Sequence, residues 1–168
     1  GASAEATSSD LFTRCPTERT RRTGCIVWDA AVVLAAMVAL HVASGDSELG
    51  EALRGAAARS GLIELGAGET GLVGLAAARA LSCSCCVLTD LPELLPGLKA
   101  NADRNALADG TKAIVRPYQW GTAESVEAAG IWPSGSRPPF GVLLAADCIY
   151  DSENVEGFVD ALRDLGDA

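Results

Sequence analysis

Three glycines that follow a short apolar segment have types and spacing that could serve chemistry. The segment Leu62–Leu65 runs into Gly66, and Gly68 and Gly71 follow before an Ala-rich helical pattern. Without side chains, these positions let a ligand approach the backbone, and the next helix offers free N–H groups at its N-terminus. The pattern predicts a nucleotide-like cofactor, either a dinucleotide bound by G-x-G-x-x-G or S-adenosylmethionine bound by an acidic residue, Glu64, followed by G-x-G. A tight strand-to-helix turn without a ligand is the third interpretation.

Asp90 stands where a cofactor's ribose would lie. It ends the second predicted strand, 19 residues beyond Gly71. One carboxylate can accept hydrogen bonds from two adjacent hydroxyl groups, so Asp90 is a candidate ribose ligand. Alternatively, Asp90 caps a helix that begins at Pro92, and the two roles are compatible.

Two further loops carry candidate functional side chains. Trp120, beside Gly121, could stack on an adenine ring, although a packing role is the alternative. Asp147 and Tyr150 leave the fourth predicted strand three residues apart, where an acid and a phenol could converge on one substrate group. For this pair the alternative is structural, with Asp147 capping a turn and Tyr150 packing on the sheet.

These residues need a sheet to bring them together. Strands are predicted at residues 62–65, 85–89, 113–115 and 140–146, and helices at residues 28–42, 48–58, 72–81, 92–105, 123–129 and 152–165, the last with Ser152 as N-cap. Apolar strands that alternate with helices indicate a parallel sheet covered on both faces, an α/β doubly wound fold. Ligands of such sheets bind beyond the carboxyl ends of the strands. The segment 28–42 is apolar almost all round, which predicts a helix buried against something large.

Composition excludes several classes of protein. There are 13 Lys and Arg against 22 Asp and Glu, a net charge of −9, which is too acidic for a protein that binds a nucleic-acid backbone. The apolar run 30–40 falls short of the roughly 18–20 residues of a membrane helix, so no membrane partner is predicted. Residues 1–22 are predicted to be a loosely ordered arm before a domain at residues 23–168. The absence of an initial Met suggests a fragment.

Cysteine and histidine usage predicts no metal site. The six cysteines include the adjacent pair Cys85 and Cys86, lack a second spaced pair, and are accompanied only by His41 in an apolar helix. Buried thiols in a reducing compartment are the better interpretation.

Several motifs together resemble one family. They are the Trp28-Asp29-Ala30-Ala31 segment, the Glu64 to Gly68 loop, Asp90-Leu91-Pro92, Asn101 with Asn105, Trp120-Gly121, and the D-x-x-Y segment from Asp147 to Tyr150. Over about residues 23–165, the sequence is similar to the methyltransferase-like 21 group of seven-β-strand protein-lysine methyltransferases, in methyltransferase family 16.

The resemblance implies a fold and a reaction. The fold would be the Rossmann-like sheet of S-adenosylmethionine-dependent methyltransferases, with strand order 3-2-1-4 and truncated here after the fourth strand and its helix, because the family continues for three more strands. The reaction would transfer a methyl group to a lysine of a non-histone protein substrate in the cytoplasm or nucleus. The oligomeric state is not implied.

The resemblance also implies a set of site residues. Those lining the S-adenosylmethionine site would be Trp28, Gly66, Ala67, Gly68, Asp90, Trp120 and Ala146, with Asp90 on the ribose. Asp147 and Tyr150 would be the catalytic pair beside the target lysine.

One departure from the family bears on cofactor binding. The family loop runs G-x-G-T-G, whereas Glu69 is inserted here before Thr70 and Gly71. The insertion places a negative charge where the cofactor's carboxylate end approaches, so we expect weaker binding. Two other functions stay open: a nicotinamide-dinucleotide-binding oxidoreductase domain, and a catalytically inactive methyltransferase-fold remnant.

Overall fold

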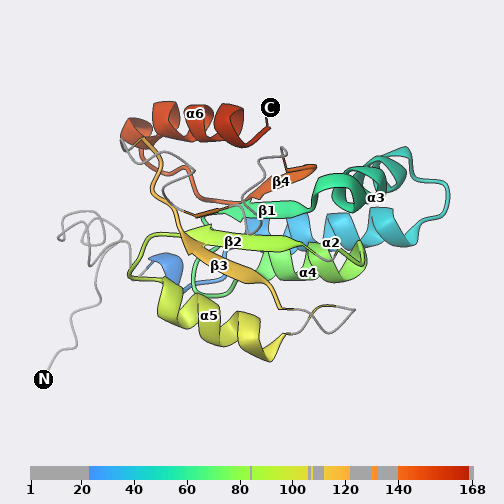
Figure 1. The fold of residues 1–168 in the computed structure, drawn as a ribbon, viewed down its shortest axis with the longest axis horizontal. Coiled ribbons are helices and arrows are strands. Elements are labelled where there is room, and N and C mark those ends of the chain that lie inside the picture. Colours follow the sequence, from blue (N-terminus) through green and yellow to red (C-terminus); the bar gives the residue numbers. More distant parts are fainter. Residues whose placement is uncertain are drawn as a thin grey trace, which may run out of the picture.

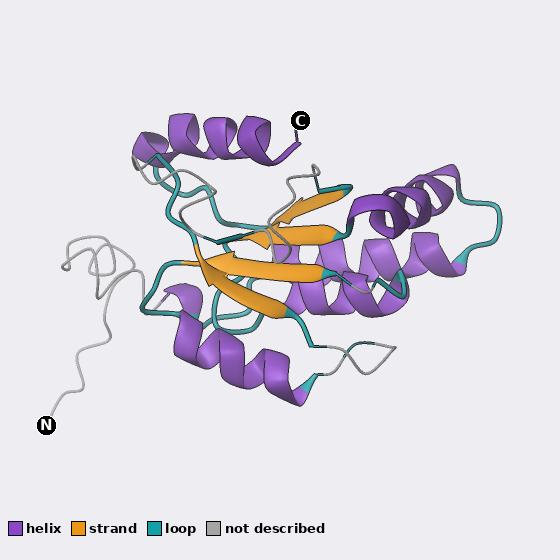
Figure 2. Ribbon diagram, in the orientation of Figure 1, coloured by secondary structure: helices purple, strands orange, loops and turns teal. Residues whose placement is uncertain are grey.

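The computed structural model describes residues 23–83, 85–105, 107, 112–121, 130–131 and 140–166 of the 168-residue chain. A twisted sheet lies at the centre, with helices on both of its faces (Figure 1). The strands lie side by side with their arrows pointing the same way (Figure 2). The predicted arm at 1–22 and the predicted helix at 123–129 lie outside the described residues.

The sheet has four parallel strands. They are β1 (Leu62–Leu65), β2 (Cys86–Asp90), β3 (Ile114–Pro117) and β4 (Val142–Ala145). Their order across the sheet is β3-β2-β1-β4, with Leu65 of β1 level with Thr89 of β2 and Ala145 of β4. The predicted α/β class and strand order are therefore confirmed. The register brings the carboxyl ends of three strands to one edge.

Helices occupy both faces of the sheet. The helices are α2 (Asp29–Ala43), α3 (Glu48–Ser60), α4 (Leu72–Ala80), α5 (Leu95–Arg104) and α6 (Val155–Gly166), the last preceded by a short 3-10 turn, η2 (Ser152–Asn154). Figure 1 shows α6 on one side of the sheet and α2 and α4 on the other. This is the doubly wound arrangement that alternating strands and helices predict.

Two hydrophobic cores lie on the two faces, because successive strand residues point in opposite directions. One core joins Leu62 of β1 and Leu88 of β2 to α4 and α5. The other joins Ile63 and Leu65 of β1 to Phe158 of α6. Strand β1 contributes to both cores with all four side chains buried, which fixes it as the middle of the fold.

Helix α2 corrects one prediction. Its composition indicated burial all round, but only Ala35 and Val38 are buried, while Val33 is 65% and Leu40 is 71% exposed. The physical reason is the layering. Helix α2 packs on α4 and α3, outside the helices that touch the sheet, so only one stripe of it meets other side chains.

Two predicted helix starts differ from the observed ones. The side chain of Asp151, not Ser152, caps η2 by accepting a hydrogen bond from the Glu153 N–H, 3.2 Å away. Helix α5 begins at Leu95, because the preceding residues form a turn in which the Leu94 N–H donates to the Leu91 carbonyl. Asp90 therefore does not cap α5.

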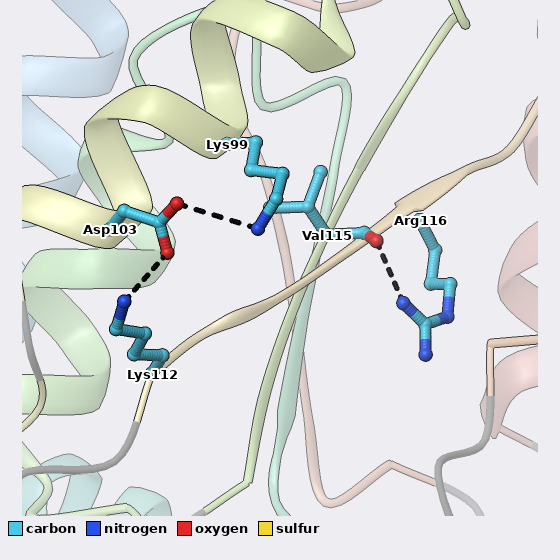
Figure 3. A network of polar contacts seen from close by, with 5 residues as sticks. All are labelled: Lys99, Asp103, Lys112, Val115 and Arg116. Atoms are coloured by element: carbon cyan, nitrogen blue, oxygen red, sulfur yellow. Dashed lines mark hydrogen bonds and ion pairs between the residues drawn. The ribbon is translucent and has the colours of Figure 1, made fainter.

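Polar contacts of Asp103 lie between α5 and the segment that leads into the edge strand β3 (Figure 3). Asp103 of α5 pairs with Lys99, 3.4 Å away, and with Lys112 before β3, 3.0 Å away. The hydrogen bond from Lys112 is the main cause that lowers the pKa of Asp103. These side chains are exposed, so the two ion pairs add little to stability.

None of the helices in the described ranges reaches the length and apolar content of a membrane span on its own. Helices α2 and α3 reach them only when taken together, and they meet at a bend of 96°.

Candidate functional site

A pocket lies at the carboxyl edge of the sheet, beyond the ends of β1, β2 and β4. Seven of the residues predicted for function line it: Trp28, Gly66, Asp90, Trp120, Ala146, Asp147 and Tyr150. They come from five separate segments of the chain, four of which the parallel sheet brings together. Glu64, Ala67 and Gly68 do not line the pocket.

In the glycine loop after β1, other segments of the chain lie so close to Gly66 and Gly68 that a side chain would not fit. Gly66 has φ +67°, and a Cβ at this position would lie 2.5 Å from the Cβ of Cys148 in the loop after β4. Gly68 has φ +61°, and its Cβ would lie 2.7 Å from the carbonyl oxygen of Gly24. Any side chain here would push away a wall of the pocket, so both positions need glycine.

Asp90 joins the glycine loop to the end of β2. Its Oδ2 accepts a hydrogen bond from the Gly68 N–H at 2.6 Å, and its Oδ1 accepts one from the Leu91 N–H at 2.7 Å. Burial raises the pKa of Asp90, and these two N–H donors act against that increase. Each oxygen keeps a second lone pair, so the carboxylate can still accept bonds from a ligand in the pocket.

Glu64 lies beneath the loop, outside the pocket. It is 3% exposed, and its Oε2 accepts a hydrogen bond from the Gly74 N–H of α4 at 2.7 Å. Burial is the main cause that raises the pKa of Glu64 to about 8, so the carboxyl group is largely protonated at neutral pH. Its place in the structure is a link from β1 to α4.

Two tryptophans from distant parts of the sequence line the pocket. Trp28 immediately precedes α2, and its Nε1–H donates to the Thr23 carbonyl at 3.2 Å. Trp120 follows β3 and meets Phe158 of α6 edge to face, with ring centroids 4.9 Å apart. The buried Nε1–H of Trp120 has no hydrogen-bond partner among the residues that the structure describes.

Asp147 and Tyr150 occupy the loop after β4. Tyr150 is 52% exposed at the pocket. Asp147 has φ +50°, an unusual conformation for a residue with a side chain, and its Oδ2 accepts a hydrogen bond from the Ala30 N–H at 3.3 Å. This bond connects the loop to the first turn of α2.

Cys148 lies between these two residues and is half-buried. Burial is the main cause that raises its pKa to about 11, so the thiol is protonated at neutral pH. Its position favours packing against Gly66 over nucleophilic chemistry.

The pocket also contains residues that the sequence did not single out by role. They include Thr23, Gly24, Tyr118, Gln119 and Asn154. Only Thr23 and Gly24 gave a signal, as the segment that precedes the Trp-Asp-Ala-Ala motif. Tyr118 and Gln119 directly follow β3 and Asn154 ends η2, and a search restricted to motif residues passes over them.

The paired asparagines of α5 support the glycine loop from outside the pocket. The side-chain amide of Asn101 donates to the Thr70 carbonyl, and that of Asn105 donates to the Asn101 carbonyl at 2.8 Å. In the described part of the chain, no three His, Cys, Asp or Glu side chains are grouped as metal ligands.

Comparison with known families agrees with this geometry. A family model described as lysine methyltransferase matches residues 13–168. The chain belongs to the lysine methyltransferase family. The resemblance inferred from separate motifs is therefore confirmed over nearly the whole sequence. The pocket at the carboxyl edge lies where a parallel sheet of this kind binds its ligands, so it is the candidate active site of this lysine methyltransferase family member.

Proposed function

We propose that this chain transfers a methyl group from S-adenosylmethionine to a lysine side chain of a non-histone protein. One observation carries the proposal. The glycine loop, Asp90 and the Asp147–Tyr150 pair converge on a single pocket, although they lie on three different strand ends. In this proposal, the cofactor subsite and the substrate subsite are adjacent parts of that pocket.

The charges in the pocket favour a cationic ligand. Within the described residues, its lining includes the carboxylates of Asp90 and Asp147 and no Lys or Arg. S-adenosylmethionine carries a sulfonium and an ammonium group against one carboxylate, whereas a nicotinamide dinucleotide brings a pyrophosphate that the two pocket carboxylates would repel. The pocket therefore favours the first ligand over the second.

The polar groups of the pocket fit the cofactor as well. Each Asp90 oxygen accepts one backbone N–H and keeps a lone pair that can accept a ribose hydroxyl. Trp28, Gly66 and Ala146 complete the wall of this subsite. Ala67 and Gly68 would act through the shape of the loop, and Glu64 through its link to α4.

The reaction is an in-line displacement, in which a neutral lysine amine forms the N–C bond while the C–S bond breaks. When bound, S-adenosylmethionine supplies an electrophilic methyl group and a thioether leaving group that keeps the bonding electron pair. The protein's part is to hold the two reactants in line and to exclude water. The proton that the methylated ammonium group carries afterwards passes to water or to a nearby acceptor.

Asp147 and Tyr150 are the groups placed to hold the amine. The target lysine has an ordinary pKa near 10.4 and must lose a proton before it reacts; desolvation in the subsite lowers that pKa, and the Asp147 carboxylate acts against this decrease. The Tyr150 ring offers an apolar and hydrogen-bonding surface, and the Asp147 carboxylate offers an acceptor that orients the amine.

The partner is a protein surface that presents a lysine. The net charge of −9 attracts basic surfaces and speeds their encounter with this chain. The cytoplasm or nucleus, which the family resemblance implies, is where we propose the reaction takes place.

Calorimetric titration with S-adenosylhomocysteine tests the proposal, with NAD and NADH titrated in parallel. Saturable binding of S-adenosylhomocysteine alone is the expected result, and a search for lysine substrates with a labelled methyl donor follows from it. Binding of NAD or NADH instead would replace the proposal with an oxidoreductase. If none of the three ligands binds, the catalytically inactive remnant becomes the better account.

A further inference from the structure

The extra residue in the glycine loop, Glu69, lies against helix α5. Its backbone N–H donates to the Gly24 carbonyl at 2.8 Å, while its side chain runs over Gly97 in the first turn of α5. Glu69 does not line the pocket. The Glu69 side chain therefore lies against α5 and not in the pocket wall.

Gly97 makes this placement possible. A Cβ on Gly97 would lie 2.7 Å from both Cδ and Cγ of Glu69 and 2.9 Å from its Cβ. Real Cβ contacts are almost never this short, and three of them along one side chain cannot be relieved by turning only its tip. No side chain caps the N-terminus of α5, so a carboxylate against its first turn is also favoured by the helix dipole.

We propose that Gly97 is a positioning residue for cofactor binding, because it accommodates the inserted Glu69 and so lets the glycine loop keep its shape. The part that concerns the cofactor rests on the proposed function. The packing of Glu69 on Gly97 does not, and it can be tested without any ligand.

A displacement of Glu69 would reach the pocket through short contacts. The Glu69 N–H is bonded to Gly24, and the Cα of the adjacent Gly68 already approaches Gly24 closely enough to exclude a Cβ. Gly24 lines the pocket, and Gly68 donates to Asp90, which also lines it. Moving Glu69 therefore shifts the positions of both the wall and the ribose ligand.

A double-mutant cycle on thermal stability tests the packing. Replacing a helical glycine with alanine normally raises Tm, because glycine disfavours helix. With Glu69 present, Gly97→Ala is expected to lower Tm instead. In a Glu69→Gly background, which removes all three clashing atoms, the same Gly97→Ala change is expected to raise Tm. The sign of the effect thus depends on residue 69.

Two matched variants serve as controls. Gly55→Ala changes a glycine of α3 whose Cβ would meet only Arg59 Nη1, at 3.4 Å, so it is expected to raise Tm and to leave ligand affinity unchanged. Glu69→Gln keeps the shape of the side chain and removes its charge. Combined with Gly97→Ala, it should remain as unstable as Gly97→Ala alone, and a recovery would overturn the steric account.

Titration with S-adenosylhomocysteine tests the consequence for the cofactor. Gly97→Ala is expected to weaken binding about tenfold or more, and Glu69→Gly combined with Gly97→Ala to restore it, in the range of couplings between touching residues. Unchanged affinity in Gly97→Ala, with tight binding by the wild type, would overturn this consequence. No binding by the wild type would count against the proposed function, while the Tm cycle would still decide the packing.

The remaining outcomes are also decisive. A higher Tm for Gly97→Ala with Glu69 intact overturns the proposal, as does a lower Tm in both backgrounds, because another neighbour would then require glycine. If Gly97→Ala does not fold, folding of the double variant supports the coupling. Failure of the double variant to fold, when Glu69→Gly alone folds, contradicts it.

Discussion

The Asp147 carboxylate and the Ala30 backbone N–H are 3.3 Å apart, although 117 residues separate them in sequence. Helix α2 has no side-chain cap of its own at Trp28, so Asp147 supplies one from the loop after β4. A carboxylate at a helix N-terminus satisfies a free donor and interacts favourably with the helix dipole. Asp147 thus joins two walls of the pocket.

Substitutions of Asp147 should separate its backbone role from its charge. Asp147→Asn keeps both an acceptor and a residue type that tolerates φ +50°, so its stability should be close to wild type. Asp147→Ala loses the cap and takes on a strained conformation, so it should be less stable by about 1–3 kcal/mol, with Asp147→Gly between the two. Urea unfolding of the three variants measures the order of their stabilities.

Methyl transfer by the same variants gives the second half of this prediction. If the carboxylate orients the lysine amine, Asp147→Asn should lose turnover while it keeps its stability. Full turnover in Asp147→Asn would mean that Asp147 acts only through α2.

Asp90 and Tyr150 should affect different steps. Asp90→Ala is expected to weaken S-adenosylhomocysteine binding by about 1.5–3 kcal/mol, because it removes a charged acceptor. Tyr150→Phe should leave that affinity intact and reduce turnover, because the ring remains and only the hydroxyl is lost. Calorimetry and a methyl-transfer assay on both variants check this. An equal loss of affinity in the two would contradict the division of roles.

Glu64 should make stability depend on pH. Burial raises its pKa from 4.5 to about 8 in the folded protein, so between these values the folded state binds more protons than the unfolded state. The stability that Glu64 contributes is complete below about pH 4.5 and is lost as the pH rises through about 8. Glu64→Gln should remove this contribution to the dependence of the free energy of unfolding on pH.

Urea unfolding of the wild type and Glu64→Gln at several pH values from about 5 to about 8, the window between the pKa of Glu64 in the unfolded and folded states, measures the effect. Glu48→Gln, the same change at an exposed position of α3, is the matched control for the substitution itself. Parallel curves for wild type and Glu64→Gln would rule out a buried, protonated Glu64.

The two sides of α2 should respond differently to substitution. Val38 is 2% exposed, so Val38→Ala should lower the free energy of unfolding by roughly 1–3 kcal/mol. Leu40 is 71% exposed, and Leu40→Gln should change the free energy of unfolding by about 0.5 kcal/mol or less. Chemical unfolding decides, and a large loss from Leu40→Gln would show that the exposed face is covered in solution.

The sequence was sufficient to predict the sheet, because each strand is a short apolar run bounded by residues that disfavour strands, and because the glycine loop after β1 has a local sequence pattern. It was not sufficient to predict the exposure of α2, since composition does not reveal which layer a helix occupies. The prediction of Ser152 as N-cap was wrong for a local reason. Asp151 and Ser152 are neighbouring side-chain acceptors, and the backbone geometry determines which of them caps η2.

The candidate site shows the same division. Asp90, Asp147 and Tyr150 follow their strands, and parallel strands end together, so their meeting could be predicted. Glu64 lies inside its strand, where alternation turns its side chain toward α4 and away from the edge. The packing of Glu69 on Gly97 could not be predicted, because no local pattern links positions 28 residues apart.

The contact between Asp147 and Ala30 has a consequence for biosynthesis. The ribosome synthesises α2 early, but the loop after β4, which completes the pocket, is synthesised more than a hundred residues later. During that interval the nascent chain holds a glycine loop and half of a binding site. A ligand of this pocket could therefore add its binding energy to folding only after β4 has been synthesised and has paired with β1.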